Sequence, residues 1–235
     1  MSKKIFIPII SLLGAITICF AICFGVCMSK LNQEESYYEQ KCNSFTVQNL
    51  NLSKGQIVFI GDSITDLYPL DNYYTDLSLA TYNRGIGGDT TDGVLNRMKV
   101  SLYDLSPSKI VLMIGINDVN GGRTNEYILS NYNKILNQIK TNLGSAQVFC
   151  MSVLPLNTGI EAYFDRDVSA LNNQVMELNF GIKQLALDYS YTFVNLFNEV
   201  CSANYELRPE LTDDFIHLNA NGFQIWTDVL KPYLV

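Results

Sequence analysis

The chain has 235 residues, of which 48% are apolar and 17% are charged, and its formal net charge is −7. This length and apolar content suffice for one folded domain with an appendage. The acidic balance, without a basic stripe, argues against nucleic acid as a partner and against docking of the folded part on anionic lipid.

The N-terminal segment predicts a membrane-spanning helix. Residues 5–28 carry no charged side chain, and as a helix they would extend about 36 Å, more than the roughly 30 Å of a bilayer core. Lys3 and Lys4 precede this segment, so the positive-inside rule places the N-terminus in the cytoplasm and the rest of the chain outside. No small-residue cleavage site follows, which favours an uncleaved signal anchor at the cell membrane. A cleaved signal peptide and a secreted protein are the alternative.

The chain is thus expected to have three parts. A cytoplasmic stub and transmembrane anchor occupy residues 1–29. Residues 30–53 are rich in Asn, Gln, Glu, Ser and Tyr with little periodicity, which is typical of a polar stalk. Residues 54–235 form the folded domain.

Short apolar runs alternate with amphipathic segments throughout the folded part. The runs predict five strands, at residues 56–60, 79–83, 109–114, 146–153 and 192–196. The amphipathic segments predict helices at residues 92–102, 124–143, 167–189 and 219–230. This alternation predicts an α/β fold, a three-layer α/β/α sandwich with a five-stranded parallel sheet. With right-handed crossovers, the expected strand order is 2-1-3-4-5, with the switch point beside the first strand.

The cysteines outside the apolar segment are Cys42, Cys150 and Cys201. An odd number leaves at least one thiol unpaired within a monomer. The sequence does not decide whether Cys150 and Cys201 form a disulfide, because it does not establish the required geometry. No Cys or His spacing resembles a zinc site, and the chain has a single histidine, so no metal is expected.

Three predicted strands end in polar or glycine-rich turns. These turns are Gly61-Asp62-Ser63, residues 85–89 and Gly115-Ile116-Asn117-Asp118. In a parallel sheet they lie at one edge, where ligands of open α/β sheets bind. The edge therefore gathers a hydroxyl, exposed backbone N–H groups and a side-chain amide. Acyl transfer requires this set, since a serine attacks a carbonyl and donors stabilise the resulting oxyanion.

A serine nucleophile also needs a base, and His217 is the one imidazole in the chain. A single histidine near an apolar segment is more often structural. Here Asp214 stands three residues earlier, where its carboxylate can accept from the imidazole Nδ1–H and stabilise the imidazolium. Asp213 is a rival, although the three-residue spacing favours Asp214.

These four segments together resemble the four sequence blocks of the SGNH (GDSL-type) hydrolases. The blocks are Gly61-Asp62-Ser63-Ile64, Gly88 before Asp89, Gly115-Ile116-Asn117-Asp118 and Asp214-Phe215-Ile216-His217, in the family's order. Residues 83–90 further resemble the platelet-activating-factor acetylhydrolase-like branch. The resemblance covers residues 54–235 and implies the flavodoxin-like hydrolase fold.

The resemblance also implies a role for each matching residue. Ser63 is the nucleophile, His217 the base and later the acid, and Asp214 the residue that orients His217. The Ser63 N–H, the Gly88 N–H and the Asn117 side chain form the oxyanion hole. Asp62 and Asp118 are expected to be structural and to hold their loops through local hydrogen bonds. This chemistry requires no metal or organic cofactor.

The substrate is expected to be an ester of a small molecule or a glycan. Pro155, Tyr163 and Phe164 lie in or beside an irregular stretch near the strand ends and are the candidates for the substrate pocket. No long apolar lid is evident, which favours short acyl groups such as acetyl. The alternatives are a lysophospholipase acting on longer chains and a non-catalytic carbohydrate-binding module at the cell surface.

Overall fold

The computed structural model describes residues 36–162 and 166–235. The predicted membrane anchor at residues 5–28 lies outside the described residues. Within the described ranges, no helix combines the length and the apolar character needed to cross a membrane.

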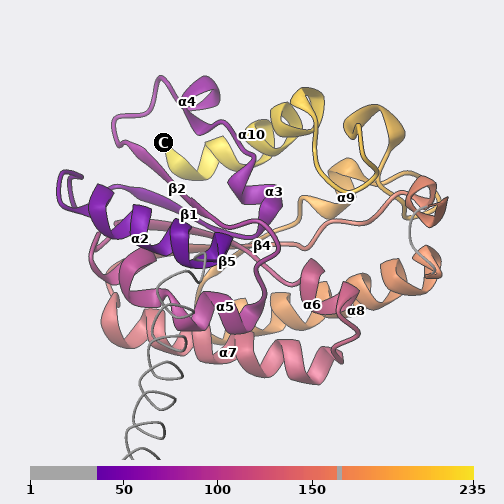
Figure 1. The fold of residues 1–235 in the computed structure, drawn as a ribbon, viewed down its shortest axis with the longest axis horizontal. Coiled ribbons are helices and arrows are strands. Elements are labelled where there is room, and N and C mark those ends of the chain that lie inside the picture. Colours follow the sequence, from indigo (N-terminus) through magenta and orange to yellow (C-terminus); the bar gives the residue numbers. More distant parts are fainter. Residues whose placement is uncertain (1–35, 163–165) are drawn as a thin grey trace, which may run out of the picture. The chain divides into compact units, whose positions relative to one another are not determined.

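Five parallel strands form one sheet in the centre of the domain (Figure 1). The strands are β1 (Ile57–Gly61), β2 (Thr81–Gly85), β3 (Lys109–Met113), β4 (Gln147–Met151) and β5 (Thr192–Val194). Their order is β2-β1-β3-β4-β5, as the sequence predicts. All five residues of β1 are buried, because a central parallel strand is covered on both faces.

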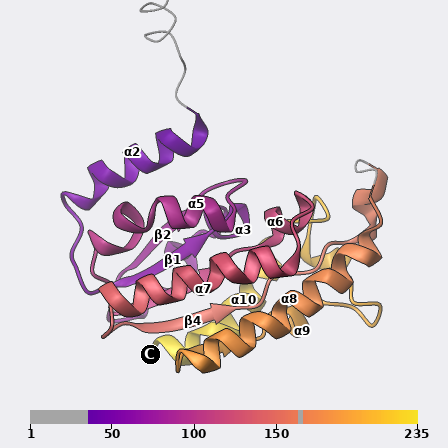
Figure 2. The same ribbon diagram turned by 90° about the horizontal axis from the view of Figure 1, so that it is seen from below.

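Helices cover both faces of this sheet, so the predicted three-layer sandwich is confirmed (Figure 1). The longer helices are α7 (Asn125–Asn142), α8 (Val168–Asp188) and α10 (Ala220–Leu234). Figure 2 shows α7 and α8 side by side on one face, while α10 lies on the other in Figure 1. The short elements are α3 (Ser63–Asp66), α4 (Leu70–Tyr73), α5 (Thr91–Asn96), α6 (Ile116–Asn120), α9 (Phe197–Val200), η2 (Thr158–Ala162) and η3 (Pro209–Leu211).

The helix expected at residues 92–102 is interrupted. The structure has α5 followed by a π-helical turn, η1 (Lys99–Tyr103). The interruption falls at Arg97, which closes α5 and is only 2% exposed. An amphipathic pattern does not reveal such a break, because the apolar residues on both sides still face the core.

The expected polar stalk at residues 30–53 contains a helix in its described part, α2 (Tyr37–Asn49). The compact unit of the domain begins at Gln40, earlier than the expected boundary at residue 54. Phe45 is 3% exposed and lies under the Arg84 guanidinium, which is 4.6 Å from the ring centroid. Arg84 also donates to the side chains of Gln48 and Asn49. One buried ring and polar contacts hold this segment, so hydrophobic periodicity could not predict it.

An aromatic cluster joins the segment after α3 to α10. The Tyr68 ring stacks on Phe223 with 4.8 Å between centroids and lies 4.7 Å from Trp226. The Tyr68 hydroxyl is 2.6 Å from Thr227 Oγ1. Because α3 begins at Ser63 and α10 follows His217 closely, this packing helps to hold these two residues at fixed positions.

Candidate active site

The structure brings Ser63, His217 and Asp214 into one hydrogen-bonded chain. His217 Nε2 lies 2.8 Å from Ser63 Oγ. On the other side of the ring, His217 Nδ1 lies 2.6 Å from Asp214 Oδ2. Ser63 and His217 are 154 residues apart in the sequence, so the fold alone makes this contact.

A tight loop presents the Asp214 carboxylate to the imidazole. Asp214 Oδ1 accepts from the backbone N–H groups of Ile216 and His217, at 3.1 and 2.8 Å. Its Oδ2 is left to face the ring. An antiparallel bridge between Thr212 and Leu218 closes the loop at its base. Asp213 contacts the Asn219 side chain instead, so the geometry favours Asp214 over its rival.

Hydrogen bonding keeps Asp214 ionised. Burial by itself would raise the pKa of its carboxyl. The hydrogen bonds from the side chain and backbone of His217 and from the backbone of Ile216 outweigh burial and hold this pKa below its ordinary value. The carboxylate can therefore accept the Nδ1–H and leave Nε2 as the acceptor facing Ser63.

The predicted oxyanion donors come from three strand ends. Ser63 is the first residue of α3, after the buried N-cap Asp62, and an N–H at that position has no intrahelical partner. Gly88 has φ +75°, and a Cβ at that position would meet no atom within 4 Å, so bare backbone is exposed there. The Asn117 side chain donates one Nδ2–H to the Asp89 carbonyl at 2.9 Å, and the second N–H of that amide remains to be directed elsewhere.

Asp62 and Asp118 both hold loops, but Asp62 bonds to a residue close to it in the sequence and Asp118 to a distant one. Asp62 accepts locally from the Ile64 N–H at 3.0 Å, as predicted. Asp118 instead accepts from the N–H and hydroxyl of Thr91, at 2.9 and 2.7 Å. Asp118 therefore ties α6 to α5, a contact between distant segments that local turn chemistry does not predict.

Three buried carboxyl groups, those of Asp62, Asp89 and Asp118, are the sequence neighbours of the predicted nucleophile and of the two other predicted oxyanion donors. Burial is the main reason why the pKa of Asp62 rises to about 7, and the neighbouring carboxylates of Asp89 and Asp118 add to the rise. Arg97 forms an ion pair with Asp89, with 2.7 Å between Nε and Oδ2. Arg97 is not among the residues predicted for the site, because a single arginine on an amphipathic segment gives no sign of being buried.

Of the three residues proposed to line the substrate pocket, the structure describes only one. Pro155 is buried, while Tyr163 and Phe164 lie outside the described residues. The segment around Pro155 is held by two side chains of α8 that sequence reasoning missed. Asn179 exchanges hydrogen bonds with the backbone of Val153, and Asn172 does the same with Leu156.

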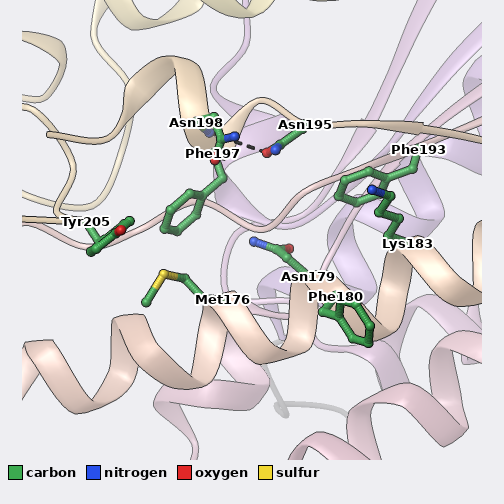
Figure 3. A pocket seen from close by; sticks show the side chains of 9 residues that line it. All are labelled: Met176, Asn179, Phe180, Lys183, Phe193, Asn195, Phe197, Asn198 and Tyr205. Atoms are coloured by element: carbon green, nitrogen blue, oxygen red, sulfur yellow. Dashed lines mark hydrogen bonds between the residues drawn. The ribbon is translucent and has the colours of Figure 1, made fainter. Parts of the chain in front are cut away.

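A separate pocket of about 220 Å³ lies between α8 and the segment from β5 onwards (Figure 3). It is lined by Met176, Asn179, Phe180, Lys183, Phe193, Asn195, Phe197, Asn198 and Tyr205. Two strands, β3 and β4, separate β5 from β1 in the sheet. This pocket therefore lies away from Ser63 and contains none of the predicted site residues.

Neither a metal cluster nor a disulfide is found in the described ranges. Within residues 36–162 and 166–235, no group of three or more His, Cys, Asp or Glu side chains is arranged to hold a metal ion. Cys150 and Cys201 are both free thiols, so the disulfide left open by the sequence is not formed.

Comparison with known proteins identifies the family of this chain. The sequence matches the GDSL-like Lipase/Acylhydrolase family over residues 59–225. It is 29% identical over 184 residues to the human platelet-activating factor acetylhydrolase IB subunit alpha2, covering 75% of this chain and 73% of that protein. The chicken protein of the same name is 34% identical over 102 residues, covering 42% of this chain and 44% of that protein.

Solved structures show the same fold. A GDSL-like lipase of Bacteroides thetaiotaomicron is 25% identical and superposes with a TM-score of 0.72, over 82% of this chain and 96% of its own. An acetyl-xylooligosaccharide esterase mutant from Geobacillus is 20% identical with a TM-score of 0.61, over 77% and 94%, and shares the fold. The chain therefore belongs to the GDSL-like lipase/acylhydrolase family and is a carboxylic ester hydrolase.

Proposed function

We propose that this hydrolase works through Ser63 as nucleophile, His217 as general base and acid, and Asp214 as the residue that orients the imidazole. The observation that carries the proposal is the unbroken chain from Asp214 Oδ2 through His217 to Ser63 Oγ, with contacts of 2.6 and 2.8 Å. Such a chain makes the hydroxyl nucleophilic and stabilises the imidazolium that forms.

The reaction has two steps, acylation of Ser63 and hydrolysis of the acyl-enzyme. Ser63 Oγ bonds to the ester carbonyl carbon while His217 Nε2 takes the hydroxyl proton. The carbon–oxygen bond to the alcohol then breaks, and the imidazolium returns the proton to the departing oxygen. Water, deprotonated by His217, attacks the acyl-enzyme, and Ser63 leaves with the proton. In both steps the Ser63 N–H, the Gly88 N–H and the Asn117 amide stabilise the oxyanion.

We propose short acyl groups, above all acetyl, on a glycan or a small molecule as the substrate class. Two similar proteins are named for acetyl esters, the platelet-activating factor acetylhydrolase subunit and the acetyl-xylooligosaccharide esterase. A series of p-nitrophenyl acetate, butyrate, octanoate and laurate tests this class. Fastest hydrolysis of the acetate or butyrate is expected, whereas a maximum at octanoate or laurate would support the alternative of a lysophospholipase.

The test of the mechanism is the Ser63→Ala variant. We expect it to lose hydrolysis of p-nitrophenyl acetate and covalent labelling by a fluorophosphonate, because both require the serine oxygen. Ser44→Ala is the matched control, since Ser44 is exposed on α2, and it should keep both activities. An active Ser63→Ala variant would contradict the proposed nucleophile. A wild-type protein with neither hydrolysis nor labelling would support the non-catalytic carbohydrate-binding module.

We further propose that residues 5–28 anchor the enzyme in the cell membrane with its catalytic domain outside. The support is the uncharged run after Lys3 and Lys4. Protease added to intact cells should remove the domain from the membrane fraction. Full-length protein in the medium would point instead to secretion after signal cleavage, and protection from protease would contradict the proposed orientation.

A further inference from the structure

The Arg97 guanidinium contacts three separate segments, the end of β1, the end of β2 and the loop after β2. Its Nε donates to Asp89 Oδ2 at 2.7 Å. One terminal nitrogen donates to the carbonyl of Arg84 at 2.7 Å and to the Ser101 hydroxyl at 2.9 Å. The other donates to the carbonyl of Gly61 at 2.9 Å. The Arg97 side chain is 1% exposed, so these contacts lie out of reach of water.

Two of these contacts, those with Gly61 and Asp89, lead to the proposed oxyanion donors. Gly61 is the last residue of β1, two residues before Ser63, and its carbonyl also accepts from the Ile86 N–H at 3.1 Å. Asp89 directly follows Gly88. The Asp89 carbonyl accepts from the Asn117 side chain at 2.9 Å. Through Gly61 and Asp89, Arg97 therefore touches the supports of all three donors.

We propose that Arg97 is a positioning residue that keeps the Ser63, Gly88 and Asn117 donors in one arrangement for the oxyanion. This inference rests on the proposed function and adds a residue that contacts no substrate. Oxyanion donors act only when they are already aligned with the position where charge develops. A planar guanidinium with five N–H donors in a rigid fork can hold a carboxylate and several carbonyls at once.

A lysine could not replace this arrangement. Its ammonium keeps the charge and can pair with Asp89, but it has three donors on a flexible stem. The Arg97→Lys variant therefore preserves the buried charge balance and removes the bridge between segments. This substitution separates positioning from simple ion pairing, because loss of one charge of a buried pair would be strongly destabilising by itself.

The experiment compares Arg97→Lys with wild type in hydrolysis of p-nitrophenyl acetate. We expect kcat to fall by about tenfold to a hundredfold with little change in KM, because the donors act on charge that appears only in the transition state. Arg84→Lys is the matched control. Arg84 is equally buried, at 2% exposed, and its side chain bonds to Gln48, Asn49 and the Asn83 carbonyl. Its kcat should stay within about twofold, since it supports no donor directly.

A double-mutant cycle with Asn117→Ala tests whether Arg97 acts on catalysis through Asn117. Alone, Asn117→Ala should lower kcat by about 10²–10³. In the Arg97→Lys background the same change should cost clearly less, because residues that act through one another are not additive. Fully additive losses, or an unchanged kcat in Arg97→Lys, would overturn the proposal.

Two further measurements keep this result unambiguous. Circular dichroism at the assay temperature shows whether Arg97→Lys is folded. If it is not, Asp89→Glu takes its place, because it keeps the buried negative charge and the carbonyl that holds Asn117 but shifts the carboxylate from its position against Arg97 Nε. Asp89→Glu is expected to show the same kcat loss, and an unchanged kcat would again overturn the proposal. Labelling of wild-type Ser63 by fluorophosphonate distinguishes failure of the proposed mechanism from failure of the proposed role of Arg97. If Ser63 is not labelled, the proposed mechanism is wrong. If Ser63 is labelled and kcat of the variant is unchanged, only the role of Arg97 is wrong.

Discussion

The two sides of the proposed active site are built in different ways. The oxyanion side stands on the ends of β1, β2 and β3 and on a network in which Arg97 and Asp89 are 1% and 2% exposed at their side chains. The base side is a loop after η3, where the side chains of His217 and Asp214 are 27% and 53% exposed. One side belongs to the protein core, and the other lies at the surface.

This difference matches what each side has to do. Oxyanion donors must be held in place before charge develops, and a buried network with every partner satisfied gives that rigidity. A base must exchange protons with a leaving alcohol and with water, so it needs access to solvent. The following predictions test whether the sides differ in this way, from the largest expected effect to the smallest.

Asp214→Asn should be the most damaging change on the base side. Two backbone N–H groups donate to Asp214 Oδ1, so the amide oxygen would take that position and the NH₂ group would face His217 Nδ1. The imidazole would then carry its proton on Nε2 and could not accept one from Ser63. We expect kcat to fall by about 10⁴, as expected for an imidazole held in the wrong tautomer, in steady-state hydrolysis of p-nitrophenyl acetate.

Asp214→Ala is the matched control for this prediction. It removes the carboxylate without offering a donor to Nδ1, so the imidazole can still adopt the productive tautomer. Its kcat should exceed that of Asp214→Asn. The opposite order would mean that the charge of Asp214, and not the tautomer it selects, is what matters.

Replacing a glycine by alanine should affect stability differently on the oxyanion side and on the base side. A Cβ at Gly85, the last residue of β2, would overlap the backbone of Asp66, which is held by a hydrogen bond from its N–H to the Asp62 carbonyl. Gly85→Ala should therefore cost about 3 kcal/mol of unfolding free energy. The atoms nearest to a Cβ at Gly159 would be those of the Phe215 ring, which is half-buried in the base loop.

We expect Gly159→Ala to stay within about 1 kcal/mol of wild type in stability and to lower kcat by about tenfold, since the displaced loop carries His217. Urea unfolding and kcat measured on both variants provide the comparison. Equal losses of stability would show that the base loop is as rigid as the strand ends.

The smallest effect is a dependence of stability on pH that arises from Asp62. Its pKa is raised to about 7, chiefly by burial, so the folded protein binds this proton more tightly than the unfolded chain. Stability from this group is therefore present at about pH 4 and is lost as the pH rises to about 7. Asp62→Asn is always neutral and can still cap α3, so the Tm of wild type relative to this variant should fall across that range.

Asp71→Asn serves as the control for the pH series. Asp71 is exposed in α4, and its replacement should leave the pH dependence of the wild-type Tm unchanged. If wild type and Asp62→Asn gave parallel curves, Asp62 would not be the group that responds to pH on the buried side.

The sequence predicted regular structure more fully than it predicted contacts between distant segments. The helices expected at 124–143 and 167–189 match α7 and α8 closely, because their apolar spacing and N-caps are local signals. For residues 30–53 no sequence pattern indicated α2, which is anchored by Phe45 and by the side chain of Arg84. No local pattern reports a contact of that kind.

The sequence by itself determined the order of strands and helices, the strand-end position of Ser63, and the choice of His217 as the one available imidazole. These follow from local periodicity, turn chemistry and composition. Only the tertiary structure decided that Asp214 turns one oxygen to the backbone N–H groups of Ile216 and His217 and the other to the His217 ring. Only the tertiary structure, too, placed Arg97 between Gly61, Arg84 and Asp89. Such a buried charge is stable only when partners from several segments surround it. These segments are separate in the sequence, and only folding brings them together.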